Sequence, residues 1–542
     1  MASARENVGP LLTKPEAAPM PNRIARRTFL QATGVVALGT TATSGTAYAD
    51  DAVDYTARRT FDDWDRLFQQ GGPGQPDQPN DNTNRDGRSG MLAWSQSYVL
   101  LGLVRMYETY RDTYYLDRLI DNVDQVLQVR DSARGVTDYR GLSLPAWRAD
   151  HPYTTGYATL ADSNGQPLLD LREALSYAED TTIAVTAGTR PETFTVKLVN
   201  TFVNRTVTHT DLSLDPASPD YAVARIYAAA PGPLQLTAVD RRPVPRAGDV
   251  PQLGSYQMHC RPVIFAVHTG MITYPIASFV RLVAGSPVLR RRYGRKAAEY
   301  LQACREAVAV HDWEYDTDHL IWPKGQPLPY DGCEQPINQS VGLGQTLVEL
   351  AIVTGDRGYR DKVAALGRMF SARLTADAGD AYQWHYWPVG GHIYDGFTKT
   401  GDPATDLSIF TPSGGPARQF EDISHGAIDV EFAVRAFRAK LAFTGHDMAR
   451  IARTFTQNVA FTDADGLPSI HTTVAGGAVG AASVAAQAPR WMQVTPWDPK
   501  VHEHCLALYN RYQPTPERDG RQAIGFGWLL ANVAYLNWGA PV

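Results

Sequence analysis

Glu421, Asp422 and His425 form the densest group of ionisable side chains in this sequence, and an apolar helical pattern follows them directly. Carboxylates and an imidazole gathered at the head of one helix are suited to proton transfer, and burying such groups idly is costly. The simpler interpretation is that Asp422 and Ser424 cap the helix while Glu421 stays in solvent. The sequence favours the chemical interpretation and makes these three residues candidate catalytic groups.

A second candidate group is the alternating segment Trp384, His385, Tyr386 and Trp387, with Tyr394 close behind. His385 and Tyr386 can supply a base and an acid, and the aromatic rings can form a wall on which a sugar ring stacks. The alternative is an aromatic core segment that contains a hydrogen-bonded histidine.

Three smaller features add candidate residues. The adjacent amides of Asn338 and Gln339 can neutralise a carboxylate or bind hydroxyls, although an asparagine at a helix start is also an ordinary cap. Tyr274 is a further candidate acid or base. Arg140, which follows Tyr139, can clamp an anionic substrate.

These side chains are positioned by a paired-helix unit that recurs along the chain. Each copy has an apolar helix, a short break and a second, amphipathic helix. Helix hairpins cannot bury their apolar faces alone, so the copies must stack on one another. If the stack closes, the polar residues at the first helices converge on the mouth of a central cavity. The copies begin near Ser97, Gly270, Asn338 and His425.

The segments outside the helix pairs predict the domain organisation. Residues 1–49 contain the pair Arg26-Arg27, an apolar stretch and an Ala-Tyr-Ala cleavage site, which predicts a twin-arginine signal peptide and secretion from a bacterial cell. Residues 50–150 then begin the helical part, residues 151–250 form a small antiparallel β insertion, and residues 251–542 complete the helical part.

Within the insertion, β-branched runs separated by Gly, Pro and Asn predict short strands. The Gly/Ala/Val-rich residues 461–490 predict a long loop. A last helix over residues 524–536 is expected to pack on the first helix, near residues 55–69. The strands are predicted over residues 181–185, 193–199, 205–210, 221–227 and 234–239.

Composition excludes several functions. The formal net charge of −6 comes without a basic patch, which argues against nucleic-acid binding. No apolar run is long enough to span a membrane. The four cysteines are too scattered for a disulfide framework or a zinc site, and most are expected to be buried thiols. We therefore expect no metal or cofactor.

The helix pairs with polar residues at their starts, the inserted sheet and the export signal together resemble (α/α)-toroid carbohydrate-active enzymes. That group includes polysaccharide lyases, glucuronyl C5-epimerases and several inverting glycosidases. The resemblance covers most of residues 90–540 and implies a mainly α toroid of stacked helix hairpins with a small antiparallel β insertion. It implies a secreted enzyme whose partner is a carbohydrate polymer or oligosaccharide.

For a lyase, the resemblance implies β-elimination at a uronic acid, which needs a group that neutralises the carboxylate, a base and an acid. It gives the neutraliser as Asn338, Gln339 or a protonated Glu421, the base as His425 or His385, and the acid as Tyr386 or Tyr274.

Hydrolysis is the alternative. An inverting glycosidase needs two carboxyl groups about 6.5–9.5 Å apart. Glu421 and Asp422 are adjacent and would diverge, so a partner such as Glu314 or Asp429 would be required. A uronyl C5-epimerase and a non-catalytic glycan-binding protein are further alternatives, and the Glu/Asp/His group argues against the last. The number of His and Tyr residues at the helix starts favours elimination.

Overall fold

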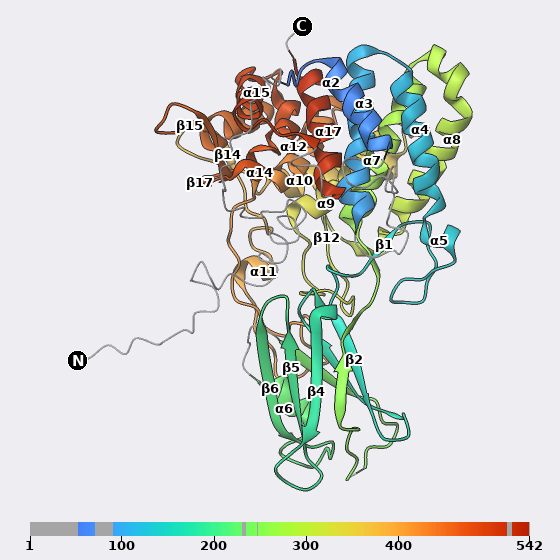
Figure 1. Ribbon diagram of the computed structural model, residues 1–542, viewed down its shortest axis with the longest axis vertical. Helices are drawn as coiled ribbons and strands as arrows, with labels where there is room; N and C mark the ends of the chain where they lie inside the picture. The colour runs from blue at the N-terminus through green and yellow to red at the C-terminus, as the bar shows by residue number, and fades with distance from the viewer. Residues whose placement is uncertain (1–52, 71–89, 230–234, 247, 517–522, 541–542) are drawn as a thin grey trace, which may run out of the picture.

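The computed structural model describes residues 53–70, 90–229, 235–246, 248–516 and 523–540, so the predicted signal peptide lies outside the described residues. The chain is a mixture of helices and several small antiparallel sheets. Figure 1 shows most of the helices together in its upper part and the larger sheets below them, with α6 (Ala222–Ala228) beside the strands. None of the helices in these ranges has the length and apolar character that crossing a lipid bilayer requires.

The four predicted helix pairs are present. The first helix of a pair is buried almost all round, as in α9, whereas the second buries a single face, as in α10. A helix that is apolar on all sides belongs in the interior, so the first helices are inner and the second ones outer. The pairs are α3 (Ser97–Tyr110) with α4 (Tyr114–Gln128), α7 (Ala266–Gly285) with α8 (Pro287–Ala309), α9 (Ile337–Thr354) with α10 (Arg357–Ser371), and α12 (Ile423–Arg438) with α13 (Gly445–Arg453).

Local sequence sets where the outer helices begin. Ser286 accepts a hydrogen bond from the Leu289 backbone N–H and caps α8, and Asp356 caps α10 in the same way. Thr444 and Asp447 form a reciprocal capping box at α13. These residues satisfy backbone N–H groups that have no partner within the helix, which fixes the breaks between paired helices.

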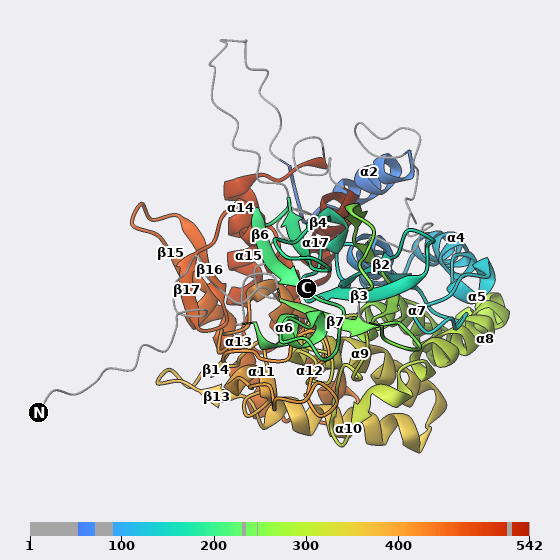
Figure 2. The same ribbon diagram turned by 90° about the horizontal axis from the view of Figure 1, so that it is seen from below.

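The inner elements contact one another in pairs along the chain. α3 packs on α7, α7 on α9, and α9 on α12. The short helix η6 (Ala488–Val494) contacts both α12 and α17 (Ala523–Trp538), and α17 packs on α3. α17 also packs on α2 (Arg58–Gln69), which confirms the predicted contact between the last and first helices. Seen from below in Figure 2, the helices lie around the projected position of the sheets.

The β part contains two four-stranded antiparallel sheets with orders β7-β3-β2-β9 and β6-β5-β4-β8. Alternate residues of β4 and β5 point into a separate apolar core, which a half-buried strand requires. The strands are β2 (Gly156–Ala161), β3 (Pro167–Glu173), β4 (Thr181–Ala187), β5 (Phe194–Asn200), β6 (Arg205–Leu212), β7 (Leu236–Asp240), β8 (Gly254–Gln257) and β9 (His259–Cys260).

Two predicted elements are wrong. The strand expected over residues 221–227 is the helix α6 (Ala222–Ala228), because Ala222 and Ile226 are one turn apart and are buried together. The loop expected over residues 461–490 contains a three-stranded sheet, a short helix and the start of η6. Gly476 and Gly477 adopt positive φ angles of 89° and 96°, which lets the chain reverse between two strands.

All four cysteines are free; Cys260 is partly exposed and the other three are buried.

Short elements join the helical and the β part. The short elements are η2 (Leu92–Gln96), α5 (Asp131–Arg134), β1 (Arg148–Ala149), η3 (Ala178–Asp180), β10 (Val263–Ile264), η4 (Asp312–Glu314), β11 (Tyr315–Asp316), β12 (His319–Leu320), β13 (Thr375–Ala376), β14 (Tyr382–Gln383), α11 (His392–Asp395), η5 (Thr454–Val459), β15 (Ala460–Thr462), β16 (Pro468–Thr473), β17 (Gly476–Val479), α14 (Ala482–Ala485) and α15 (Lys500–Tyr512).

Candidate active site

The segment that leads into α12 is held on both sides by backbone contacts. The Glu421 N–H donates to the Trp384 carbonyl at 3.0 Å, and Asp422 forms a bridge with Thr473. α12 then begins, and Asp422 caps it by accepting hydrogen bonds from the Ser424 and His425 N–H groups. The predicted cap is therefore present, and it fixes the backbone that carries the candidate residues.

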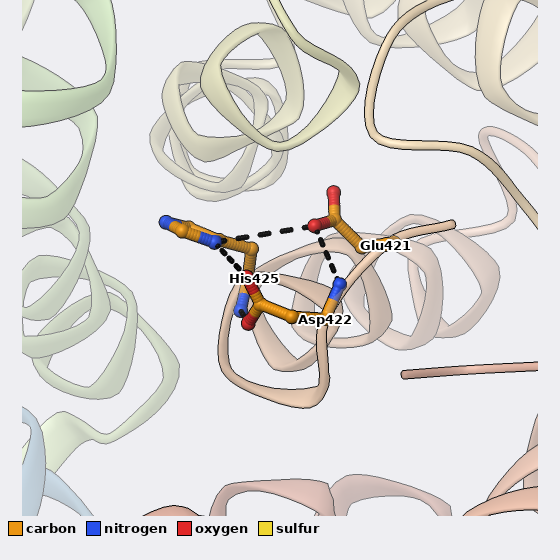
Figure 3. Close-up of side chains that lie close together, drawn as sticks. All are labelled: Glu421, Asp422 and His425. Atoms are coloured by element: carbon orange, nitrogen blue, oxygen red, sulfur yellow. Dashed lines mark hydrogen bonds and ion pairs between the residues drawn. The ribbon is translucent and has the colours of Figure 1, made fainter. Parts of the chain in front are cut away.

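Asp422 also binds the side chain of His425. The Asp422 Oδ2 atom lies 2.7 Å from Nδ1 of His425. Figure 3 marks this contact with a dashed line. Burial alone would lower the pKa of His425, but the Asp422 carboxylate outweighs burial and raises it. Burial would raise the pKa of Asp422, but His425 and the helix N–H groups outweigh it and lower that pKa. The two side chains form an ion pair when His425 is protonated, and they are 12% and 24% exposed for His425 and Asp422, respectively.

Glu421 lies next to this pair and is wholly buried. The interpretation that it stays in solvent is therefore wrong. Its Oε2 accepts a hydrogen bond from Asn338 Nδ2 at 2.9 Å, and its Oε1 accepts from the Asp422 N–H at 3.0 Å. Burial, and then the nearby Asp429 carboxylate, raise the pKa of Glu421 well above its usual range. This environment disfavours the ionised form of the Glu421 carboxyl group.

Tyr386 completes the group. Its ring lies 5.7 Å from the ring of His425, centroid to centroid, at an interplanar angle of 67°. Burial, followed by the charges of Glu421 and Asp422, raises the pKa of Tyr386, while the nearby amides of Gln339 and Asn338 act in the opposite direction. The phenol is therefore a neutral donor at physiological pH.

The start of α9 is bound to the same place, because the Ile337 N–H donates to the Tyr386 carbonyl at 3.1 Å. This contact places the Asn338 and Gln339 amides beside the start of α12. The structure thus brings together six of the residues that the sequence singled out: His425, Asp422, Glu421, Tyr386, Asn338 and Gln339.

His385 and Tyr394 lie on another side of the same segment. His385 Nδ1 is 3.0 Å from the Arg418 carbonyl oxygen, and its ring stacks on Phe420 and meets the edge of Tyr394. Successive side chains of an extended segment point to opposite sides, so His385 turns away when Tyr386 faces His425.

The two tryptophans of this segment are core residues. Trp384 is wholly buried, and its indole N–H donates to Asp429 Oδ2 at 2.7 Å. Trp387 is 1% exposed and packs edge-on against Trp322 and Tyr330. Neither offers a face to a sugar, and the simpler interpretation of an aromatic core holds for both.

Tyr274 belongs to a buried ion network within the helices. Its hydroxyl donates to Glu431, which also binds Arg105 Nη2 at 2.6 Å. Tyr274 stands more than two turns into α7, whereas the candidate site gathers residues at the starts of α9 and α12. This depth along the helix separates it from His425.

Tyr139 and Arg140 serve a local role. The Arg140 guanidinium pairs with Asp138 at 2.7 Å and lies over the Trp313 ring. The side chain expected to clamp an anionic substrate therefore already has a carboxylate. Tyr139 is partly buried beside it, 5.6 Å from the guanidinium.

Two further residues near the inner helix starts were not expected. Arg490, on η6, donates to the carbonyl of Ser424, the neighbour of His425. His268, in the first turn of α7, accepts a hydrogen bond from Trp94 at 3.0 Å, and burial lowers its pKa to about 3. His268 stands just before Gly270 at a predicted helix start and could have been found on that ground. Arg490 lies in the segment interpreted as a loop, so the sequence carried no signal for it.

Glu421, Asp422 and His425 each offer an atom of the kind that binds divalent cations, within 4.8 Å of one another. Among the residues that the structure describes, this is the group that could hold a metal. Asp422 and His425 share a hydrogen bond at 2.7 Å, and both oxygens of Glu421 already accept hydrogen bonds.

Comparisons of the chain with protein-family models, curated proteins and solved structures found no match. Function must therefore be argued from the geometry of the site.

Proposed function

We propose that this protein is a secreted enzyme that cleaves a uronic-acid-containing polysaccharide by β-elimination. The observation that carries the proposal is the Asp422–His425 pair next to the Tyr386 phenol. A base held by a carboxylate and a neutral phenol beside it are the two proton-transfer groups that elimination needs. The twin-arginine segment supports export.

The helical part fits an (α/α) toroid. The inner elements α3, α7, α9, α12, η6 and α17 contact one another in sequence, and α17 returns to α3. The starts of α9 and α12 are at the same place, where Asn338 binds Glu421. This supports a ring whose inner helix starts form one rim, and the candidate site lies on that rim.

His425 is the proposed base. When Asp422 holds the proton on Nδ1, the neutral imidazole carries its lone pair on Nε2. This nitrogen removes the proton from C5 of the uronate. Asp422 then stabilises the imidazolium that forms, as its short contact with Nδ1 allows.

Tyr386 is the proposed acid. The electron pair released at C5 forms the C4–C5 double bond, and the bond from C4 to the glycosidic oxygen breaks. The Tyr386 hydroxyl gives its proton to that oxygen, so the products are an unsaturated uronate and a free sugar hydroxyl. The phenolate is then reprotonated by water, and His425 returns its proton to solvent. The raised pKa of Tyr386 keeps the phenol protonated before the reaction.

Gln339 is the proposed amide that contributes to neutralising the substrate carboxylate. The residue is partly buried as a whole, whereas Asn338 is 1% exposed and already binds Glu421. Glu421 and Asn338 then act as positioning residues, because together they fix the segment that carries Asp422 and His425. This division of roles follows from which side chains remain open to a ligand.

Hydrolysis is the second candidate, and one observation favours it. Glu421 has the raised pKa that a general acid of a glycosidase requires. Its side chain is 0% exposed, however, so it cannot reach a glycosidic oxygen in this conformation. This burial makes elimination the stronger proposal.

The test is to incubate the mature protein with a panel of uronic polysaccharides, namely alginate, pectate, hyaluronan and heparan sulfate. Elimination gives a product with a conjugated double bond that absorbs in the ultraviolet. New reducing ends without that absorbance would indicate hydrolysis, and incorporation of solvent deuterium at C5 without cleavage would indicate epimerisation. Binding without any of these products would make the chain a glycan-binding protein and end the enzymatic proposal.

A further inference from the structure

Arg490 differs from the other buried arginines of the described chain. Arg105, Arg118, Arg242 and Arg435 each form an ion pair with at least one carboxylate. Arg490 is 5% exposed, and no carboxylate among the described residues lies within ion-pair distance of it. Its positive charge is therefore buried without a negative partner from the described part of the chain.

The partners of Arg490 are neutral. Its Nη1 donates to the Tyr98 hydroxyl at 2.7 Å, and its Nη2 donates to the Ser424 carbonyl at 2.8 Å and to Gln487 Oε1 at 3.4 Å. The guanidinium carbon also lies 5.2 Å from the Tyr98 ring and 5.8 Å from the Trp528 ring. These contacts hold the guanidinium in place but do not neutralise it.

These contacts also place Arg490 between the starts of two inner helices. Tyr98 is at the start of α3, Ser424 is at the start of α12, and Trp528 is on α17. α3 and α12 are not neighbours in the packing order, because η6 and α17 lie between them on one side and α7 and α9 on the other. Arg490 on η6 thus links the start of α12, where His425 lies, to the start of α3 past α17.

Burying a charge without a partner is costly, and buried charges are as a rule paired with an opposite charge. A guanidinium has five N–H donors, and the three neutral contacts leave donors for a carboxylate. We propose that Arg490 binds the carboxylate of a uronate sugar at the rim that carries His425. This assignment rests on the proposed function for its substrate class, and it names the side chain that makes the site select acidic over neutral sugars.

The position of Arg490 also affects His425. Its positive charge opposes protonation of the imidazole and lowers the pKa of His425. Removing that charge raises the pKa of His425, so the rise of activity with pH moves to higher pH. A purely structural role for Arg490 would leave this pH profile in place.

The experiment is calorimetric titration of the mature protein with sodium glucuronate and with D-glucose, which differ only in the group at C6. The wild type is expected to bind glucuronate at least about 10-fold more tightly than glucose, the effect of one charge-assisted hydrogen bond. Arg490→Met is expected to abolish this preference without weakening glucose binding. Arg140→Met is the matched control, because Arg140 already pairs with Asp138, and it is expected to keep the preference.

Equal binding of the two sugars by the wild type would overturn the assignment, and so would a full preference for glucuronate in Arg490→Met. If Arg490→Met does not fold, Arg490→Lys decides: a reduced preference supports the assignment, and an unchanged one overturns it. A further outcome is a glucuronate preference that depends on Arg490 in a protein that cleaves no polysaccharide. This result would support the anion site and contradict the proposed function.

Discussion

One carboxylate, that of Asp422, both begins α12 and orients His425. Its Oδ1 accepts the Ser424 and His425 N–H groups at 2.9 and 3.1 Å, and its Oδ2 holds the His425 ring at 2.7 Å. The helix start and the base are therefore fixed by the same side chain. The same carboxylate therefore has a structural role at the helix start and a role in the chemistry that we propose.

Replacing the proposed base tests the site directly. His425→Gln is expected to lower kcat on the cognate polysaccharide by about 100-fold or more, the usual contribution of a general base. His385→Gln is the matched control, because His385 lies on another side of its segment and stacks on Phe420. Equal losses in the two variants would remove the special role of His425.

The pH dependence of activity follows from the Asp422–His425 pair. Burial alone would lower the pKa of His425, and the Asp422 carboxylate raises it above the ordinary value of 6.5. The base must be neutral, so kcat rises as pH increases through this raised pKa. Asp422→Asn removes the carboxylate. In this variant kcat is expected to be smaller and to rise with pH at a lower pH than in the wild type. The measurement is kcat against pH for both proteins, and a rise at unchanged pH would contradict the assignment of the base.

The same pair stabilises the fold over a defined pH range. The pKa of His425 is raised on folding, so its contribution is complete below about pH 6.5 and is lost as pH rises through the raised value. The pKa of Asp422 is lowered, so its contribution is complete above about pH 4 and is lost as pH falls.

Asp422→Asn should therefore reduce the free energy of unfolding by about 1.5–3 kcal/mol between these limits, and by less outside them. Asparagine still caps a helix well, so the change isolates the charge. Denaturant unfolding at several pH values measures it, and a deficit that is the same at every pH would argue against the pair.

Tyr274→Phe separates stability from catalysis. The variant loses the hydroxyl that donates to Glu431 in a fully buried site, which is expected to cost about 1.5–3 kcal/mol of unfolding free energy. Turnover at a temperature where the variant is folded should be unchanged, because Tyr274 lies within the ion network of Arg105 and Glu431. A loss of kcat with unchanged stability would instead place Tyr274 in the reaction.

The close contact between α7 and α9 depends on Gly270, which has no side chain. A Cβ at Gly270 would overlap the carbonyl oxygen of Gly342, which is backbone and cannot move aside cheaply. Gly270→Ala is expected to lower the unfolding free energy by about 1–3 kcal/mol. Gly294→Ala in α8 meets nothing within 4 Å and should raise it by up to about 1 kcal/mol. Thermal unfolding compares the two, and a stable Gly270→Ala would show that the helices are less closely packed.

The helix pairs and most of the candidate site could be predicted from the sequence because their signals are local. The apolar period of α9 and α12 and the breaks near Gly355 and Thr444 are contained in single stretches of chain. Glu421, Asp422 and His425 are neighbours along the chain, so their proximity followed from their spacing. The segment of α6 was predicted as a strand because its β-branched and aromatic residues favour strands, whereas the burial of Ala222 and Ile226 on one face accompanies a helix.

The tertiary structure alone decided which of these residues meet and which are separated. Asn338 reaches Glu421 across 83 positions of sequence, and Arg490 reaches Tyr98 across 392. No local pattern encodes such contacts, because they depend on how helices stack and on which face each side chain occupies. Residue types and spacing thus determined the helices and the kind of chemistry, whereas packing selected His425 over His385 and left Arg490, not Arg140, without a carboxylate among the described residues.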